Sequence, residues 1–322
     1  MRGMKPRITV VGSFAVGLTM RAPRFPVKGE TLIGSDFDMG PGGKGSNQAV
    51  GAARLGAESH LVAVIGTDIF GDVGVNLYKQ EGVGTTHLRR TAERNTGVGF
   101  IILNAEGDNE IVLDMGANHL LSPADVDGAE DLIAASDVVI SVLEISPATA
   151  AHAMKAARKH GALSLLNPAP AQALDDSLLS QVDVLTPNES ELRILCGLAP
   201  EGTGGSRTRP DELIELAHRL QKRGVRQLVV TRGGEGALIV TAEGNTEHVA
   251  GQKVDVVDTT GAGDAFTCAL AVALAEGRPL TESVRFATFA GAHACTKLGV
   301  IPALARRAEV ERMMAGSKGH PA

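Results

Sequence analysis

One short segment combines an acidic side chain with small residues that leave the backbone accessible. It reads Asp258-Thr-Thr-Gly-Ala-Gly-Asp-Ala-Phe266 and runs directly into an Ala- and Leu-rich helical stretch. Partnerless N–H groups at a helix start, together with the helix dipole, stabilise an anion. Gly261, Ala262 and Gly263 therefore predict an anion hole, and Asp264 beside it can accept a proton from an attacking hydroxyl. The alternative, that Asp264 only complements the helix dipole, does not explain the flanking glycines.

A second segment also concentrates glycine around one charged side chain. It reads Gly40-Pro-Gly-Gly-Lys-Gly-Ser-Asn-Gln-Ala49, and a helix over Asn47–Leu55 is expected to follow, capped by Ser46 or Asn47. It is not a Walker A loop, because Lys44 is followed by glycine rather than by Ser or Thr. The glycines permit close approach of the backbone to a ligand, so the segment suits a small polyol or an anion.

These segments need a rigid frame, and the rest of the chain predicts one of the α/β class. Short aliphatic runs alternate with helical stretches along the sequence. The predicted strands are Ile8–Gly12, Ser59–Ile65, Val138–Val142, Leu163–Leu166, Val182–Leu185 and Gln227–Thr231. Such alternation predicts a doubly wound, mostly parallel sheet flanked by helices.

Two stretches of a different texture, 18–39 and 96–114, interrupt this alternation. The second consists of two expected strands around a turn at Glu106–Asn109. Together they predict a small inserted β-sheet that forms a lid over a site; the alternative is a pair of hairpins at the edge of the main sheet. The α/β domain would then comprise residues 1–17, 40–95 and 115–322.

Composition excludes several classes of function. The 322 residues carry a formal net charge of −6, which argues against a nucleic-acid partner. No apolar run approaches the roughly 20 residues that span a bilayer, so a membrane partner is not expected. Three cysteines without a CxxC pair, and no secretory segment before the first strand, favour the cytoplasm. Segments 202–210 and 316–322 are expected to be a surface loop and a tail.

Four motifs, in this order, resemble those of the ribokinase (PfkB-type) family of sugar kinases. They are the second glycine-rich segment above, Leu166-Asn-Pro-Ala-Pro170, Thr186-Pro-Asn-Glu189 and the segment around Asp264. The resemblance extends from the first strand to about Leu304. It implies a ribokinase-like fold and ATP-dependent phosphorylation of a hydroxyl of a pentose or related sugar, with Asp264 as general base. Phosphoryl transfer needs positioning and charge neutralisation, which these residues can supply.

The resemblance also assigns binding roles. The sugar-binding positions are Gly43, Lys44, Gly45, Asn47 and Glu144. The nucleotide-binding positions are Asn188, Thr231, Arg232, Gly233, Gly234, Glu235, Gly236, Gly263 and Thr288. Glu191 is expected to act on Mg²⁺ through water. A monovalent cation, K⁺, is expected at Asp258, Thr260, Ala294, Lys297 and Gly299, with weaker activation because Ala303 stands where the family offers a serine hydroxyl.

The chain departs from the family pattern after its first strand. The family usually has Gly-Ser-x-Asn-x-Asp there, and the Asp accepts hydrogen bonds from the sugar. Ala15 and Gly17 stand at these two positions. A register shift, a lid carboxylate such as Asp36 or Asp38, or a different substrate would each account for this.

Two further functions therefore stay open. One is a nucleoside kinase of the same family, and the other, from a different class, is a non-catalytic ligand sensor on a kinase fold. Sugar and ATP are the expected partners, together with a second copy of the chain bound through the lid.

Overall fold

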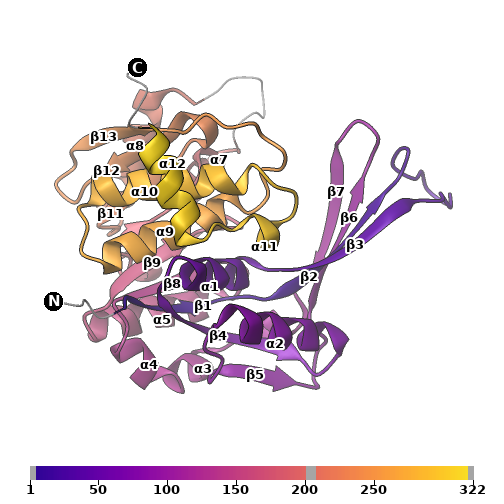
Figure 1. Ribbon diagram of the computed structural model, residues 1–322. Coiled ribbons are helices and arrows are strands. Elements are labelled where there is room, and N and C mark those ends of the chain that lie inside the picture. Colours follow the sequence, from indigo (N-terminus) through magenta and orange to yellow (C-terminus); the bar gives the residue numbers. More distant parts are fainter. Residues whose placement is uncertain (1–4, 201–207, 318–322) are drawn as a thin grey trace.

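The computed structural model describes residues 5–200 and 208–317 and is built around one large sheet (Figure 1). Its strand order is β13-β12-β11-β10-β9-β8-β1-β4-β5. The strands are β1 (Arg7–Val11), β4 (Glu58–Gly66), β5 (Leu88–Thr91), β8 (Val138–Val142), β9 (Leu163–Asn167), β10 (Val184–Leu185), β11 (Gln227–Thr231), β12 (Gly236–Val240) and β13 (Thr246–Ala250). Within this large sheet, as far as the chain is described, only the pairings of β12 with β11 and β13 are antiparallel.

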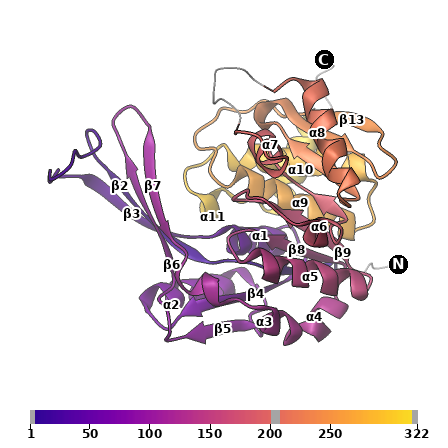
Figure 2. The ribbon, with the colours of Figure 1, turned by 180° about the vertical axis from the view of Figure 1, so that it is seen from behind.

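Helices cover both faces of this sheet (Figures 1 and 2). They are α1 (Lys44–Arg54), α2 (Ile69–Glu81), α3 (Pro123–Asp127), α4 (Glu130–Ala134), α5 (Pro147–Lys159), α6 (Asp176–Leu179), α7 (Glu189–Leu195), α8 (Pro210–Lys222), α9 (Ala262–Ala275), α10 (Leu280–Ala294), α11 (Val300–Ala303) and α12 (Arg307–Ser317), with 3₁₀ turns η1 (Gly116–Leu120) and η2 (Gly233–Glu235). None of these helices is long and apolar enough to cross a bilayer within the residues described.

Each face of the sheet has its own apolar core. Ile8 and Val10 of β1 contribute to one cluster, on the side of α1 and α9, and Val11 contributes to the other, on the side of α5. This alternation follows from the two-residue period of a strand whose two faces are both buried. The doubly wound α/β fold predicted from the sequence is confirmed.

The inserted segments form a separate four-stranded sheet that projects from the body (Figure 1). Its order is β3-β2-β6-β7, with β2 and β6 parallel and the outer pairs antiparallel. The strands are β2 (Ala15–Arg21), β3 (Ser35–Gly42), β6 (Gly97–Leu103) and β7 (Asn109–Asp114). The alternative of two hairpins on an edge of the main sheet is therefore wrong.

One buried side chain, Asn118 of η1, anchors the base of the small sheet. Its amide nitrogen donates to the carbonyl oxygens of Phe14 at 2.7 Å and Met115 at 2.8 Å, and its oxygen accepts from the Phe14 N–H at 2.9 Å. Phe14 precedes β2 and Met115 follows β7, so the two ends of the inserted sheet are held at one point. Most of the expected loop 202–210 and tail 316–322 lies outside the described residues.

Candidate active site

The start of α1 is built differently from the sequence expectation. The helix begins at Lys44, after Gly43 with φ 87°, and no side chain of α1 caps it. The expected cap at Ser46 or Asn47 is wrong, because groups distant in sequence bond the first amides. Glu144 accepts from the Lys44 N–H at 2.8 Å, and Ser13 accepts from the Ser46 N–H at 2.8 Å.

Glu144 is therefore the anion at the start of α1. The Ser13 hydroxyl also donates to its Oε2, at 2.5 Å, and Gly45 lies so close to the segment between β1 and β2 that a Cβ atom on it would sit 2.3 Å from the Ser13 nitrogen. Burial raises the pKa of Glu144, and the nearby Lys44 and the Ser13 hydrogen bond only partly oppose this effect. With its first amides already occupied, this loop suits a polyol better than a second anion.

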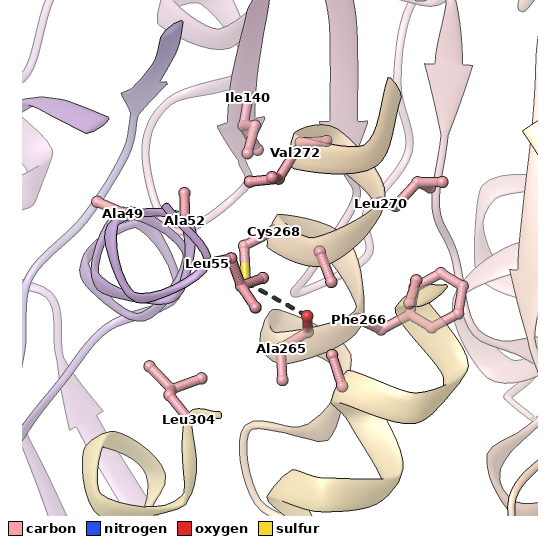
Figure 3. Packing of buried hydrophobic residues seen from close by; sticks show 14 of the residues in the cluster. Ala49, Ala52, Leu55, Ile140, Ala265, Phe266, Cys268, Leu270, Val272 and Leu304 are labelled. Atoms are coloured by element: carbon pink, nitrogen blue, oxygen red, sulfur yellow. Dashed lines mark hydrogen bonds between the residues drawn. The ribbon is translucent and has the colours of Figure 1, made fainter. Parts of the chain in front are cut away.

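Asp264 lies at the start of α9, and α1 holds it. The side chain is 4% exposed, and its two oxygens accept from neighbouring amides, Oδ2 from Asn47 Nδ2 at 2.8 Å and Oδ1 from Gln48 Nε2 at 2.9 Å. Cys268 of α9 lies between the two helices (Figure 3), and a Cβ atom added at Gly51 of α1 would clash with its sulfur, so the glycine allows the helices to approach closely. Residues 216 or more apart in sequence thereby meet at one carboxylate.

Lys44 provides the positive charge at this place. The carboxylate of Asp264 contributes most to raising its pKa; burial opposes the shift, and Glu144 and Glu191 add to it. The ammonium group thus stays charged and balances part of three surrounding carboxylates.

The turn before α9 leaves backbone N–H groups available. Gly261 has φ 79°, in the left-handed region that glycine tolerates. The Ala262 N–H donates to the Thr259 carbonyl at 3.2 Å, whereas those of Gly261, Gly263 and Asp264 have no acceptor among the described residues. Free N–H groups were expected at Gly261, Ala262 and Gly263. Ala262 is therefore the exception, and Asp264 takes its place.

A cavity of about 210 Å³ brings these groups together. Seven residues selected from the sequence line it: Lys44, Asn188, Glu191, Thr231, Gly261, Gly263 and Asp264. The sequence did not assign the other five, Asn167, Ala169, Thr186, Thr259 and Thr267. A carboxylate, a cation and free amides around one small polar cavity are suited to the transfer of a phosphoryl group to a hydroxyl.

Comparison with known proteins decides the family. The family described as pfkB family carbohydrate kinase matches residues 5–306. The chain belongs to this family. It is 37% identical to a ribokinase of Haemophilus influenzae over 306 residues, 95% of this chain and 97% of that protein, and 38% identical to a deoxyribokinase of Salmonella typhi over 260 residues, 80% of this chain and 82% of that one.

A solved structure gives the same answer. The Arabidopsis thaliana ribokinase complexed with ribose and ATP superimposes with a TM-score of 0.90 at 29% identity, covering 97% of this chain and 99% of that one. The protein is accordingly an ATP-dependent carbohydrate kinase, which transfers a phosphoryl group to a sugar hydroxyl and generally needs a divalent metal.

Among the residues expected to bind the nucleotide, some polar groups are already bonded within the protein. Asn188 and Glu191 cap α7 reciprocally, with N–H to side-chain distances of 2.8 Å in both directions, which is an ordinary helix start. Burial raises the pKa of Glu191. Arg232 forms ion pairs with Glu189 at 2.7 Å and Glu235 at 2.6 Å, so its guanidinium group stabilises the loop itself.

The rest of the expected nucleotide loop has open space around its glycines. It turns through η2, and Cβ atoms added at Gly233 or Gly234 would have no atom within 4 Å. Thr288 lies farther away, buried on α10, and its hydroxyl donates to the Arg285 carbonyl at 2.7 Å. The structure therefore brings Thr231 to the cavity but not Thr288.

Asp258 joins the two loops of the expected cation site. It accepts from the N–H groups of Thr260 at 2.9 Å and Gly299 at 3.1 Å. Burial works against its charge, but the hydrogen bonds from Thr260 and Gly299 outweigh this and hold its pKa below the usual value. The segment 294–299, with Ala294 and Lys297, is thereby placed next to residues 258–260. The Ala303 carbonyl accepts from His293 at 3.1 Å.

The departure at Ala15 and Gly17 is a real feature of the inserted sheet. They lie on β2 opposite Gly42 and Gly40, and no acidic residue occurs between positions 7 and 29, so a register shift cannot supply the missing carboxylate. Asp38 precedes Gly40 by two residues on β3. It therefore lies on the same face of the sheet, where it is exposed to solvent.

Sequence reasoning missed Gln48 and Asn167. Gln48 is fully buried and donates to both Asp264 and Asn167, and Asn167 in turn donates to the Thr186 carbonyl. Both residues stand inside the motifs named above, which was the only available signal. The contacts of Gln48 cross more than a hundred residues and follow from the packing of α1 against α9 and the sheet.

Proposed function

We propose that this kinase transfers the γ-phosphate of ATP to a hydroxyl of a pentose or related sugar, with Asp264 as the general base. The observation that carries the proposal is a buried carboxylate at the wall of a polar cavity, directly beside the free N–H groups of Gly261 and Gly263. The carboxylate takes the proton of the attacking hydroxyl. The N–H groups and the ammonium of Lys44 stabilise the charge on the transferring phosphoryl group.

The sugar is proposed to lie between the body and the inserted sheet. Glu144 accepts from both Ser13 and Lys44 at Oε2, and Asn47 Oδ1 is buried without a partner among the described residues. Both groups can therefore accept hydrogen bonds from sugar hydroxyls. The nucleotide would lie beyond Asn188 and Thr231, on the loop of Gly233 and Gly234.

The metal roles follow from the donors present. The described residues contain no cluster of three or more His, Cys, Asp or Glu side chains that could hold a metal ion by themselves. Glu191 contributes a single carboxylate to the cavity, which fits Mg²⁺ held chiefly by nucleotide oxygens and water. We propose that K⁺ binds at Asp258 and the adjacent carbonyl groups, where it would supply positive charge next to the amides of the anion hole.

The inserted sheet supports a homodimer. Met39, Leu18, Phe100 and Val112 are in register across its four strands and so share one face, and Phe100 and Val112 are 60% and 72% exposed. Apolar side chains exposed in one row are typical of an interaction surface, and we propose that it packs against a second lid. The three cysteines are free thiols, which fits the proposed cytoplasmic location.

Glu144→Gln should separate the sugar side from the nucleotide side. The amide oxygen can still accept from Ser13 and Lys44, so the start of α1 is preserved, while the charge offered to the sugar is lost. We expect the KM for the sugar to rise about tenfold or more, the value of one charge-assisted hydrogen bond, and the KM for ATP to stay within about twofold. Glu191→Gln, which changes a carboxylate lining the cavity beside Asn188, is the matched control and should affect mainly the dependence on Mg-ATP. Equal changes in both KM values for Glu144→Gln would contradict the assignment.

The sugar that this kinase phosphorylates is expected to differ from ribose. The difference should lie at the hydroxyls that the family's Asn and Asp would bind, where this chain has Ala15 and Gly17. ADP release with a panel of pentoses, deoxypentoses and nucleosides tests the function as a whole. ADP release dependent on a sugar supports the proposal, preference for a nucleoside would favour the alternative acceptor class, and no turnover with any acceptor would leave only a sensor.

Restoring the two side chains tests the departure directly. A Cβ atom at Gly17 would meet its nearest atoms at 3.7 Å, and Gly17 is not among the residues with positive φ, so an aspartate fits there. The Ala15→Asn, Gly17→Asp variant should gain about tenfold in kcat/KM for ribose. Thermal unfolding controls for misfolding. A wild type with low-micromolar KM for ribose and a folded variant without any gain would show that another residue supplies the contacts.

A further inference from the structure

A buried chain of side-chain amides connects Asp264 to the carboxyl ends of strands in the main sheet. Gln48 Nε2 donates one hydrogen to Asp264 Oδ1 at 2.9 Å and the other to Asn167 Oδ1 at 3.0 Å. Asn167, the last residue of β9, donates from Nδ2 to the Thr186 carbonyl at 3.0 Å. The carboxylate on α9 is thus tied through α1 to residues that end two neighbouring strands.

The two amides that bond Asp264 differ in their freedom. Asn47 donates to Oδ2, but its own oxygen has no partner, so this amide can turn over and exchange its contact for a ligand. Both hydrogens of the Gln48 amide are committed to fixed acceptors. Gln48 is therefore the group that determines the plane of the Asp264 carboxylate before substrate binds.

The unsatisfied oxygen of Gln48 argues against a purely structural role. Gln48 is 0% exposed, and its Oε1 is buried without a hydrogen-bond partner among the described residues. A buried unpaired oxygen destabilises the fold, and an apolar side chain of similar length would avoid that loss. The position is thus better suited to aiming a donor at Asp264 than to packing.

We propose that Gln48 is a positioning residue for phosphoryl transfer: by spanning Asp264 and Asn167 it holds the base in the orientation that meets the acceptor hydroxyl. The proposal rests on the proposed role of Asp264 as general base. A base that has lost its fixed orientation still carries its charge, so substrate binding is retained and the chemical step slows.

The test uses Gln48→Met, which keeps the length of the side chain and removes both donors, with Mg-ATP and the sugar that gives the highest rate in the acceptor panel. We expect kcat to fall about tenfold, with both KM values within about twofold of the wild type and thermal stability equal or higher. In an Asp264→Ala background the same substitution should cause no further loss, because the carboxylate it orients is gone. Gln48→Glu, which keeps the shape and places an acceptor in place of the donor, provides a second variant should the first fail to fold.

Gln221→Met is the matched control. Gln221 Nε2 also donates to two acceptors, the carbonyl oxygens of Arg226 at 3.1 Å and Thr241 at 2.7 Å, but on α8 and away from the cavity. This variant should lose stability and keep kcat.

The outcomes separate the two proposals. Wild-type kcat in the folded Gln48 variants, or a further loss of the same size in the Asp264→Ala background, overturns the positioning role alone. Full activity of Asp264→Asn, or no turnover with any sugar, overturns the proposed function and this inference with it.

Discussion

Asp264→Asn is expected to fold and to bind ATP but to lose turnover by about 10²–10⁴-fold, the usual contribution of a general base. The fold tolerates the change because an amide can replace the carboxylate in both of its contacts. Gln48 can still donate to the remaining oxygen, and Asn47 can turn its amide so that its partnerless oxygen accepts from the new NH₂ group. Steady-state ADP release gives the turnover, and calorimetric titration with ATP measures binding.

The matched control for this prediction is Asp72→Asn. Asp72 lies in the first turn of α2, as Asp264 lies in the first turn of α9, but it is exposed and pairs with Arg90. If Asp264 only complemented the helix dipole, the two substitutions would have similar, small effects on stability and none on turnover. Near-wild-type turnover of Asp264→Asn would therefore rule out the general base.

The fold could be predicted because its signals are local. The run Val138–Val142 is aliphatic at every position but Ser141 and forms a strand with the same limits, buried throughout, since both faces of a central parallel strand are covered. The inserted sheet was recognisable from its different texture. Its pairing was not, because the parallel contact of β2 with β6 joins residues about 80 positions apart, and no local pattern specifies such a register.

The site could be predicted only as far as its motifs are local. The backbone of Gly261 and Gly263 leaves its N–H groups free within one turn of chain, as expected, so the motif was sufficient there. The partner of the α1 amides was not predictable, because Glu144 lies 100 residues away and reaches Lys44 only when β8 ends beside the start of α1. The same limit concealed Gln48, whose acceptors lie on α9 and β9.

The helices α1 and α9 both begin at the cavity, but the N–H groups at their starts have different partners. The start of α1 is already neutralised by Glu144 within the protein, whereas the start of α9 keeps free N–H groups. Lys44 is the first residue of α1, and Asp264 at the start of α9 contributes most to raising its pKa. The proposed function uses this difference: an incoming phosphate would find positive potential at α9 and Lys44, and a neutral polyol would meet the acceptors near α1.

Gly263→Val is expected to lower kcat by about 10²–10³-fold, the loss typical when one donor of an oxyanion hole is removed. Gly263 is the second residue of α9 and lines the cavity, and a Cβ atom added to it would have no protein atom within 4 Å. The valine side chain would therefore not disturb the fold but would extend into the space where the phosphoryl oxygens approach the N–H group. Since those contacts strengthen in the transition state, kcat should fall more than the KM for the sugar rises.

A graded series and a control make this prediction specific. Gly263→Ala introduces only the Cβ atom and should cause a smaller loss than the valine variant, because the smaller side chain leaves part of the approach open. Gly316→Val makes the same change at another helical glycine with open space around it, on α12, and should leave kcat unchanged. Unchanged kcat in a folded Gly263→Val variant would show that no phosphoryl oxygen approaches this turn, and the anion hole would then have to be sought at Lys44 and the Gly233–Gly234 loop instead.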